Sequence, residues 1–122
     1  MYANPLQAYE SVEKTTLPGR ELEAMILTRA ARKLKHCQDN WNNQERHKAL
    51  DKALKFNQRI WSIFQTELTS PDNPLPANLK RDLLQLSGFV DKRIFETMAH
   101  PEPEKLSIII SINQNIAAGL RN

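Results

Sequence analysis

The sequence contains few of the residues that cross-linked folds and membrane spans require. Cys37 is the one cysteine, so no disulfide can form within the chain, and a single thiol suits a reducing compartment. The longest apolar stretch, residues 108–112, is far shorter than the roughly 18 residues of a membrane span. The opening MYANPLQAYESVEK lacks a basic segment followed by an apolar one, so we expect no secretory signal. We predict a cytoplasmic protein without membrane insertion.

The motifs of catalytic and metal sites are also missing. His36, His47 and His100 are scattered, and no H-x-x-x-H, H-E-x-x-H or C-x-x-C pairing or glycine-rich phosphate loop occurs. Cys37 follows His36, but adjacent helical residues point about 100° apart, and Cys37 falls on an apolar stripe. That position favours a buried, unreactive thiol. We predict a protein that is not an enzyme and binds no metal, nucleotide or other cofactor.

Glycines are few and prolines are grouped, and the groups divide the chain into helices. Prolines occur at 5, 18, 71–76 and 101–103, where the missing N–H and fixed φ interrupt a helix. Between these positions the apolar residues recur every three or four residues, and no strand pattern appears. We predict one all-α domain over residues 1–122, a compact bundle of four main helices. These cover about 18–40, about 44–69, a stretch opened by Pro76 and about 103–119, and a short N-terminal helical segment precedes them.

Each main helix carries an apolar stripe that we expect to face the core. The stripes are Leu22, Ile26, Ala30, Leu34, Cys37 and Trp41; Leu50, Leu54, Trp61, Phe64 and Leu68; Leu79, Leu83, Leu86, Val90, Ile94 and Met98; and Leu106, Ile109, Ile110, Ile116 and Leu120. Other apolar residues lie off these stripes, namely Met25, Leu27, Phe56, Ile60, Ile63, Phe89 and Phe95. A second apolar face indicates either deep burial or a surface for a partner.

A carboxamide interrupts the stripe of the second helix. Asn57 lies one turn after Leu54 and one turn before Trp61, where an aliphatic residue is expected. In one interpretation Asn57 forms hydrogen bonds across the core and fixes the helix register, with Asn113 of the fourth helix as the natural partner. In the other, Asn57 lines a groove that a partner helix completes.

The net charge of +3 is unevenly distributed. Residues 20–60 carry ten basic and five acidic side chains. Arg29, Arg32, Lys33 and His36 recur at helical spacing and form one basic face, which could follow a phosphate backbone. The exposed aromatic residues that single-stranded RNA readers use are missing there, because Trp41 and Trp61 fall on apolar stripes. The alternative is a simple solvated helix face.

As a whole, the chain resembles the FlaF family of bacterial flagellar biosynthesis regulators. The resemblance is carried by six segments in one order that span nearly the entire sequence. They are MY with AYESV, then PGRELEAMILTRAARKL, DNW, FNQRIWSIF, TSPDNPLP with LKRDLLQL, and PEPEKLSIIISINQNIAAGLR.

This resemblance implies a non-enzymatic assembly factor. FlaF-like proteins act with a partner regulator, FlbT, to balance flagellin synthesis against export, and they bind flagellin as a secretion chaperone. They are thereby linked to the flagellar export apparatus. An apolar groove in a small bundle could cover an amphipathic flagellin helix. We expect the groove on the second helix, at Phe56, Asn57, Arg59, Ile60 and Ile63.

The alternative is an RNA-associated regulator of flagellin mRNA translation. It would act through the basic face of the first helix, Arg29, Arg32, Lys33 and His36. In the favoured interpretation, nucleic acid is involved only weakly or indirectly. Salt separates the two, because phosphate contacts weaken steeply as salt rises, whereas apolar contacts do not.

Overall fold

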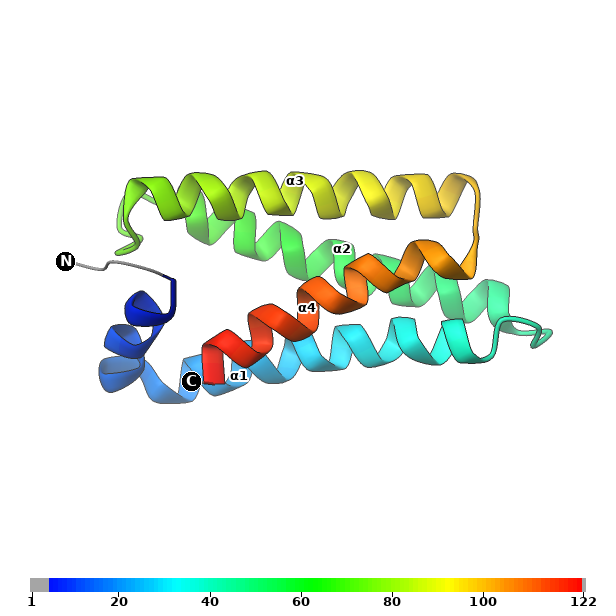
Figure 1. Ribbon diagram of the computed structural model, residues 1–122, viewed down its shortest axis with the longest axis horizontal. Coiled ribbons are helices and arrows are strands. Elements are labelled where there is room, and N and C mark those ends of the chain that lie inside the picture. The colour runs from blue at the N-terminus through cyan, green and yellow to red at the C-terminus, as the bar shows by residue number, and fades with distance from the viewer. Residues whose placement is uncertain (1–4, 122) are drawn as a thin grey trace.

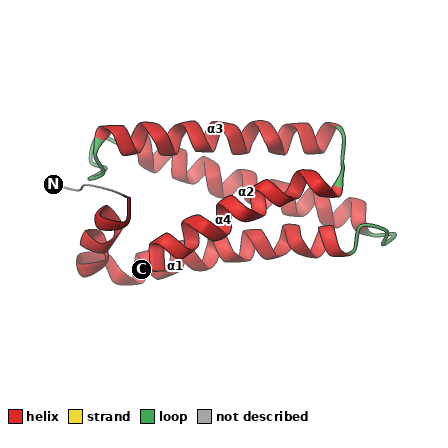
Figure 2. Ribbon diagram, viewed as in Figure 1, coloured by secondary structure: helices red, strands yellow, loops and turns green. Residues whose placement is uncertain are grey.

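The protein is a bundle of four α-helices. The computed structural model describes the backbone of residues 5–121 and the side chains of residues 21–121. Within that part of the chain no strand occurs, and the all-α prediction is confirmed (Figure 2). The helices are α1 (Pro5–Asp39), α2 (Arg46–Thr69), α3 (Ala77–Ala99) and α4 (Leu106–Arg121), and a 3-10 turn, η1 (Pro103–Lys105), leads into α4.

The four helices form two pairs. The first and last helices, α1 and α4, make the most extensive contact, and α4 runs obliquely across α1 (Figure 1). Small buried residues such as Ala24, Ala31 and Ala117 leave room for the close approach of these two helices. The other pair is α2 with α3, and α2 also packs against α1, whereas α3 touches α4 only slightly. Consequently α1 and α2 are each covered from two sides.

One large core and one small satellite cluster hold the bundle together. Leu27, Leu34, Leu54, Ile94 and Ile109 are among the completely buried side chains of the large core. The satellite cluster lies where α2 turns into α3, and it contains Leu68, Leu75, Leu79 and Leu83. The predicted stripe of α3 is confirmed, since Leu79, Val90 and Ile94 are buried and Leu83, Leu86 and Met98 are partly buried.

The corner between α2 and α3 is built around Asn73. Its side-chain amide donates to the carbonyl of Glu67 at 3.0 Å, and its side-chain oxygen accepts from the backbone N–H of Leu75 at 3.0 Å. Lys80 Nζ donates to the Asn73 carbonyl at 3.3 Å. The corner therefore has internal partners for the backbone groups that its prolines leave outside a helix.

The predicted start of the first helix is wrong. We predicted a separate short segment and a helix from about Pro18, but α1 is continuous from Pro5. Its N-terminal, blue part, which contains Pro18 and Gly19, turns away from the axis of the rest of the helix (Figure 1). Inside a helix, proline removes one hydrogen bond and clashes with the preceding turn, which can bend the helix without ending it.

The start of α2 lies close to the predicted one. The sequence predicts a start at about residue 44, and α2 begins at Arg46 without a side-chain cap. Instead, Asn43 Oδ1 accepts a hydrogen bond from the backbone N–H of Glu45 at 2.7 Å. The asparagine thus stabilises the turn before the helix and not its first turn.

Two apolar residues lie on the opposite side from the one predicted. Leu22 is 53% exposed, although it was placed on the core stripe, and Ile60 is 6% exposed, although it was expected in the groove. Leu27, which lies off the stripe, is 0% exposed, so of its two alternatives deep burial is the one observed. Because α1 and α2 are each covered from two sides, their buried faces are wider than one stripe. Ala30, Leu34 and Cys37 are buried as predicted.

Adjacent residues of α3 provide a test of this packing. Ile94 is completely buried and Phe95 is 66% exposed. Ile94→Ala should lower the free energy of unfolding by about 2–5 kcal/mol, because it leaves a cavity in the core. Phe95→Ala should change it by no more than about 0.5 kcal/mol. Urea denaturation of both variants measures the difference, and equal losses would contradict the orientation of α3.

Candidate functional site

Two buried asparagines and a tryptophan join three helices in the middle of the bundle. Asn57 of α2 and Asn113 of α4 are both 0% exposed. The Asn113 amide donates to Asn57 Oδ1 at 2.6 Å, and Trp61 Nε1 donates to Asn113 Oδ1 at 3.0 Å. The Asn57 amide donates to the carbonyls of Ala30 in α1, at 3.2 Å, and Ala53, at 2.8 Å.

The network satisfies every polar group that it buries. Each carboxamide oxygen accepts and each carboxamide nitrogen donates, so neither amide pays the full penalty of desolvation. The prediction that Asn57 is buried and bonded to Asn113 is confirmed. Of the two interpretations, the structure therefore supports the core role, because the Asn57 side chain is not accessible from the surface.

The residues predicted as a groove on α2 do not share one surface. Ile63 is 50% exposed and Arg59 is exposed, but Ile60 is in the core, and Phe56 is partly buried against it. Ile60 is therefore unavailable as an anchor, which corrects its predicted position. The physical reason is that α2 packs on both α1 and α3, which places Ile60 in the core and leaves the side that carries Arg59 and Ile63 in contact with solvent.

The basic face predicted on α1 is present. Arg29, Arg32, Lys33 and His36 are all exposed. Lys33 Nζ lies 5.1 Å from the centre of the Phe56 ring, a cation–π contact between α1 and α2. The basic face thus borders α2 at Phe56, although the basic face and the groove on α2 were predicted to serve competing functions.

A pocket opens at the other end of the helices, where α2 turns into α3. Its volume is about 190 Å³. The side chains come from all four helices and the corner, and most of them are apolar. They are Glu23, Trp61, Phe64, Glu67, Leu68, Asn73, Pro74, Leu75, Leu83, Ile116 and Leu120. We call this the bundle-end pocket.

The shape of the bundle-end pocket depends on the amide network and on the corner. Trp61 is 2% exposed and held by its hydrogen bond to Asn113, and Phe64 packs edge-on against it with ring centres 5.7 Å apart. Leu75 is positioned by the hydrogen bond of its backbone to Asn73. The charged residues among the lining side chains are Glu23 and Glu67, so the lining is apolar with an acidic component.

This pocket was not predicted from the sequence. The core stripes included Leu68, Leu83, Ile116 and Leu120, and at their end of the bundle the helices leave space beside these residues. A signal was present in the proline-rich TSPDNPLP, which separates α2 from α3 by seven residues and carries Leu75 into the pocket. A long corner of this kind indicates space between the helix ends only when it is known which helices pack against each other.

Cys37 is buried, as its position on the apolar stripe predicted. Its side chain is 3% exposed and belongs to the large core. Burial raises the pKa of the Cys37 thiol above its ordinary value of 9.0, and the nearby charge of Arg46 opposes this only in part. A thiol in this state is a poor nucleophile.

The described part of the chain contains no cluster of three or more histidine, cysteine, aspartate or glutamate side chains that could hold a metal ion. Among the same residues, no helix combines the length and the hydropathy that crossing a bilayer requires.

Comparison with known proteins gives one match that covers nearly the whole chain. The family model described as Flagellar protein FlaF matches residues 5–120. Neither a curated protein nor a solved structure matches the chain. The matched range includes the bent N-terminal part of α1, the amide network and the bundle-end pocket.

The amide network predicts coupled losses of stability. Asn57→Leu leaves the Asn113 amide without its acceptor, and Asn113→Leu leaves both Asn57 Oδ1 and Trp61 Nε1 unpaired. Each should lower the free energy of unfolding by about 1–3 kcal/mol. The double variant should lose less than the sum of the two, because the residues share one bond. Urea denaturation completes the cycle, with the exposed Asn115→Leu as a near-neutral control.

The burial of Cys37 predicts that its thiol is alkylated slowly in the folded protein and that the folded protein loses stability in alkaline solution. The folded thiol holds its proton to a higher pH than the unfolded one, so stability should fall as pH rises from about 9 through the raised pKa. Thermal melts between pH 8 and 10.5 should show a larger decrease for the natural chain than for Cys37→Ala. Iodoacetamide at pH 8 should label the thiol rapidly only after unfolding. Rapid labelling of the folded protein would contradict the burial.

Proposed function

Because the chain belongs to the FlaF family of flagellar proteins, we propose that it binds flagellin and supports the synthesis and secretion of flagellin as a chaperone. The observation that carries this proposal is the bundle-end pocket, an apolar recess in a small all-helical protein. An unassembled filament subunit has helical surface that is buried only in the filament. A pocket of this kind could cover part of that surface.

The size of the pocket limits the number of anchoring side chains. A cavity of about 150 Å³ in another protein holds a benzene molecule, so about 190 Å³ accommodates about one large apolar side chain. A helix held by so few anchors forms a limited interface, and a limited interface can be released. Reversible release is what a chaperone requires when it delivers its client to an export apparatus.

The charged groups of the pocket favour one class of helix. Glu23 and Glu67 lie among the apolar lining residues. A client helix with a basic residue next to its apolar anchors would therefore bind better than one with an acidic residue there. We accordingly propose that the client segment is amphipathic and has a positive charge at the edge of its apolar face.

The basic face of α1 supports a second candidate function. Arg29, Arg32, Lys33 and His36 are exposed on one helix, and this arrangement suits RNA phosphates. The second candidate is a regulator that binds flagellin mRNA through this face. The same face could instead bind an acidic surface of a protein partner, such as an FlbT-type regulator in the cytoplasm.

Filling the bundle-end pocket provides the test of flagellin binding. Leu83 is partly buried and lines the pocket, so Leu83→Trp should occupy the space without placing a charge in it. We expect at least tenfold weaker binding of purified flagellin, measured by isothermal titration calorimetry, and a melting temperature that does not fall by more than a few degrees. The matched control is Gln85→Trp, which adds the same side chain at an exposed position of α3 and should bind normally.

Charge reversal on the basic face of α1 distinguishes flagellin binding in the pocket from the RNA function. Reversal of charge at Arg29, Arg32 and Lys33 should leave flagellin capture intact if the pocket is the binding site. Loss of capture in this variant, sensitivity to nuclease, or a steep decline in capture between 50 and 200 mM salt would favour the RNA function instead. Unchanged flagellin binding by Leu83→Trp would exclude the pocket as the site.

A further inference from the structure

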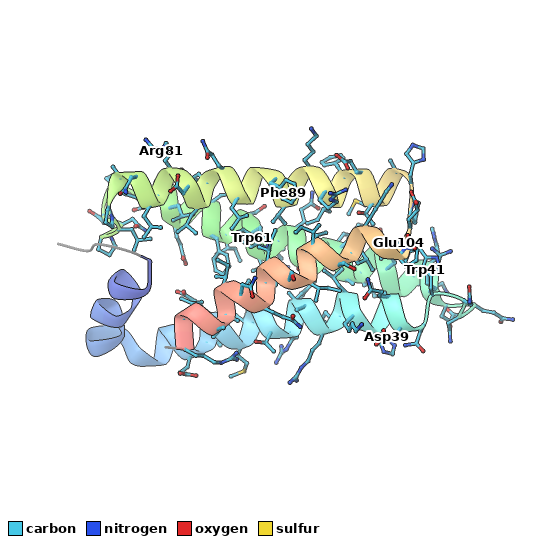
Figure 3. All side chains as sticks on the ribbon, in the orientation of Figure 1. Asp39, Trp41, Trp61, Arg81, Phe89 and Glu104 are labelled. Carbon is cyan, nitrogen blue, oxygen red and sulfur yellow. The ribbon has the colours of Figure 1, made fainter. Side chains whose placement is uncertain are left out.

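The N-terminal part of α1 lies at the same end of the molecule as the bundle-end pocket. After the bend, the ribbon of residues 5–20 stands at the end where the α2–α3 corner and the C-terminal turns of α4 are found (Figure 1). The pocket lining includes Glu23, only three residues after this segment. The labelled Trp61 lies further along the bundle from the same end (Figure 3).

The sequence of this segment has an apolar face of its own. Leu6, Tyr9 and Val12 recur at intervals of three residues, which places them on one side of a helix. Gln7, Ser11 and Lys14 fall on the opposite side of the same helix. An amphipathic helix with one apolar face has the pattern that an apolar pocket binds.

We infer that residues 5–20 cover the bundle-end pocket in the free protein and compete with the client helix for it. The occupant is thus a segment of this chain, and it is joined to Glu23 of the pocket wall through Glu21 and Leu22 of the same helix. Because this connection is short, the segment stays beside the pocket, and even a weak contact would be populated. The bend of α1 places the segment at the end of the bundle where the pocket opens, instead of along the axis of the rest of α1 (Figure 1).

Competition would reduce the apparent affinity for the client. If the segment covers the pocket in about nine of ten molecules, the apparent Kd is about tenfold higher than that of the open pocket. This cover keeps the apolar lining from water when no client is present. It also gives the protein a means of releasing a client, since the segment can reoccupy the pocket as the client leaves.

Site-specific photo-cross-linking of the full chain tests the cover without any partner. A benzophenone side chain replaces Tyr9 in one sample and Ser11 in the other, and mass spectrometry locates the cross-links in the monomer. From position 9 we expect links to peptides that contain Leu68, Leu75 or Leu83. From position 11 we expect at least fivefold fewer of these links. Equal yields from both positions, or links from position 9 only to α1 itself, would overturn the inference.

Client affinity tests the competition, and this arm rests on the proposed function. Tyr9→Asp places a charge on the apolar face of the segment, and Ser11→Asp places the same charge on its polar face. If the segment competes, Tyr9→Asp should bind purified flagellin about three- to tenfold more tightly than the natural chain, and Ser11→Asp should match the natural chain. Weaker binding by Tyr9→Asp would overturn competition, because it would make the segment part of the client site.

The cross-linking and the affinity measurements together distinguish an error in the inferred cover from an error in the proposed function. If no flagellin binds to any variant while position 9 still cross-links to the pocket, the proposed function is wrong and the cover stands. If flagellin binds to the pocket but position 9 does not cross-link there, the cover is wrong and the proposed function stands. Circular dichroism melts of the Tyr9→Asp and Ser11→Asp variants confirm that both are folded.

Discussion

The bundle depends on one buried pair of amides. Asn57 and Asn113 face each other across the core, and their bond joins α2 to α4, while the other hydrogen bonds of Asn57 include α1. Because an unpaired amide in this core is costly, α2 has one favourable position along its axis relative to its neighbours. Leucines at these two positions would also pack in the core, but they would tolerate small shifts of α2 along its axis. The hydrogen bonds of the two amides do not tolerate such shifts, because each donor must stay opposite its acceptor. The polar groups thereby fix the register of the helices, and the apolar side chains hold the helices close together.

The bundle-end pocket follows from that register. Trp61 lies one turn beyond Asn57 on α2, and its bond to Asn113 holds the indole as the floor of the pocket. Beyond Trp61 the wall is made by Phe64 and Leu68, which are only partly buried. A polar network in the middle of the molecule therefore determines the position of an apolar recess at its end. The basic face of α1 has no such connection to the network, and its nearest link to α2 is the contact of Lys33 with Phe56.

Much of this arrangement could be predicted from the sequence, because its signals are local or periodic. Proline groups determine the joints between α2 and α3 and between α3 and α4. The recurrence of apolar residues gives the buried faces of α3 and α4, and the positions of Asn57 and Asn113 on the stripes of α2 and α4 give their pairing. Ile60 was misplaced because the width of a buried face depends on how many neighbours a helix has, which periodicity does not encode. The pocket was missed for a related reason: Leu83 and Leu120 look like core residues, and only the three-dimensional arrangement shows that space remains beside them.

The pairing of α1 with α4 has a consequence for how the protein is made. The most extensive helix contact joins the first helix of the chain to the last, so the two surfaces that meet are separated by most of the sequence. While the ribosome is still adding α2 and α3, the apolar side of α1 has no α4 to bind, and α2 is the neighbour available to it. Native pairing of α1 with α4 begins only after α4 has emerged, when α2 and α3 have already been synthesised. The nascent chain therefore exposes helical apolar surface during its own production, and it buries this surface when α4 packs on α1.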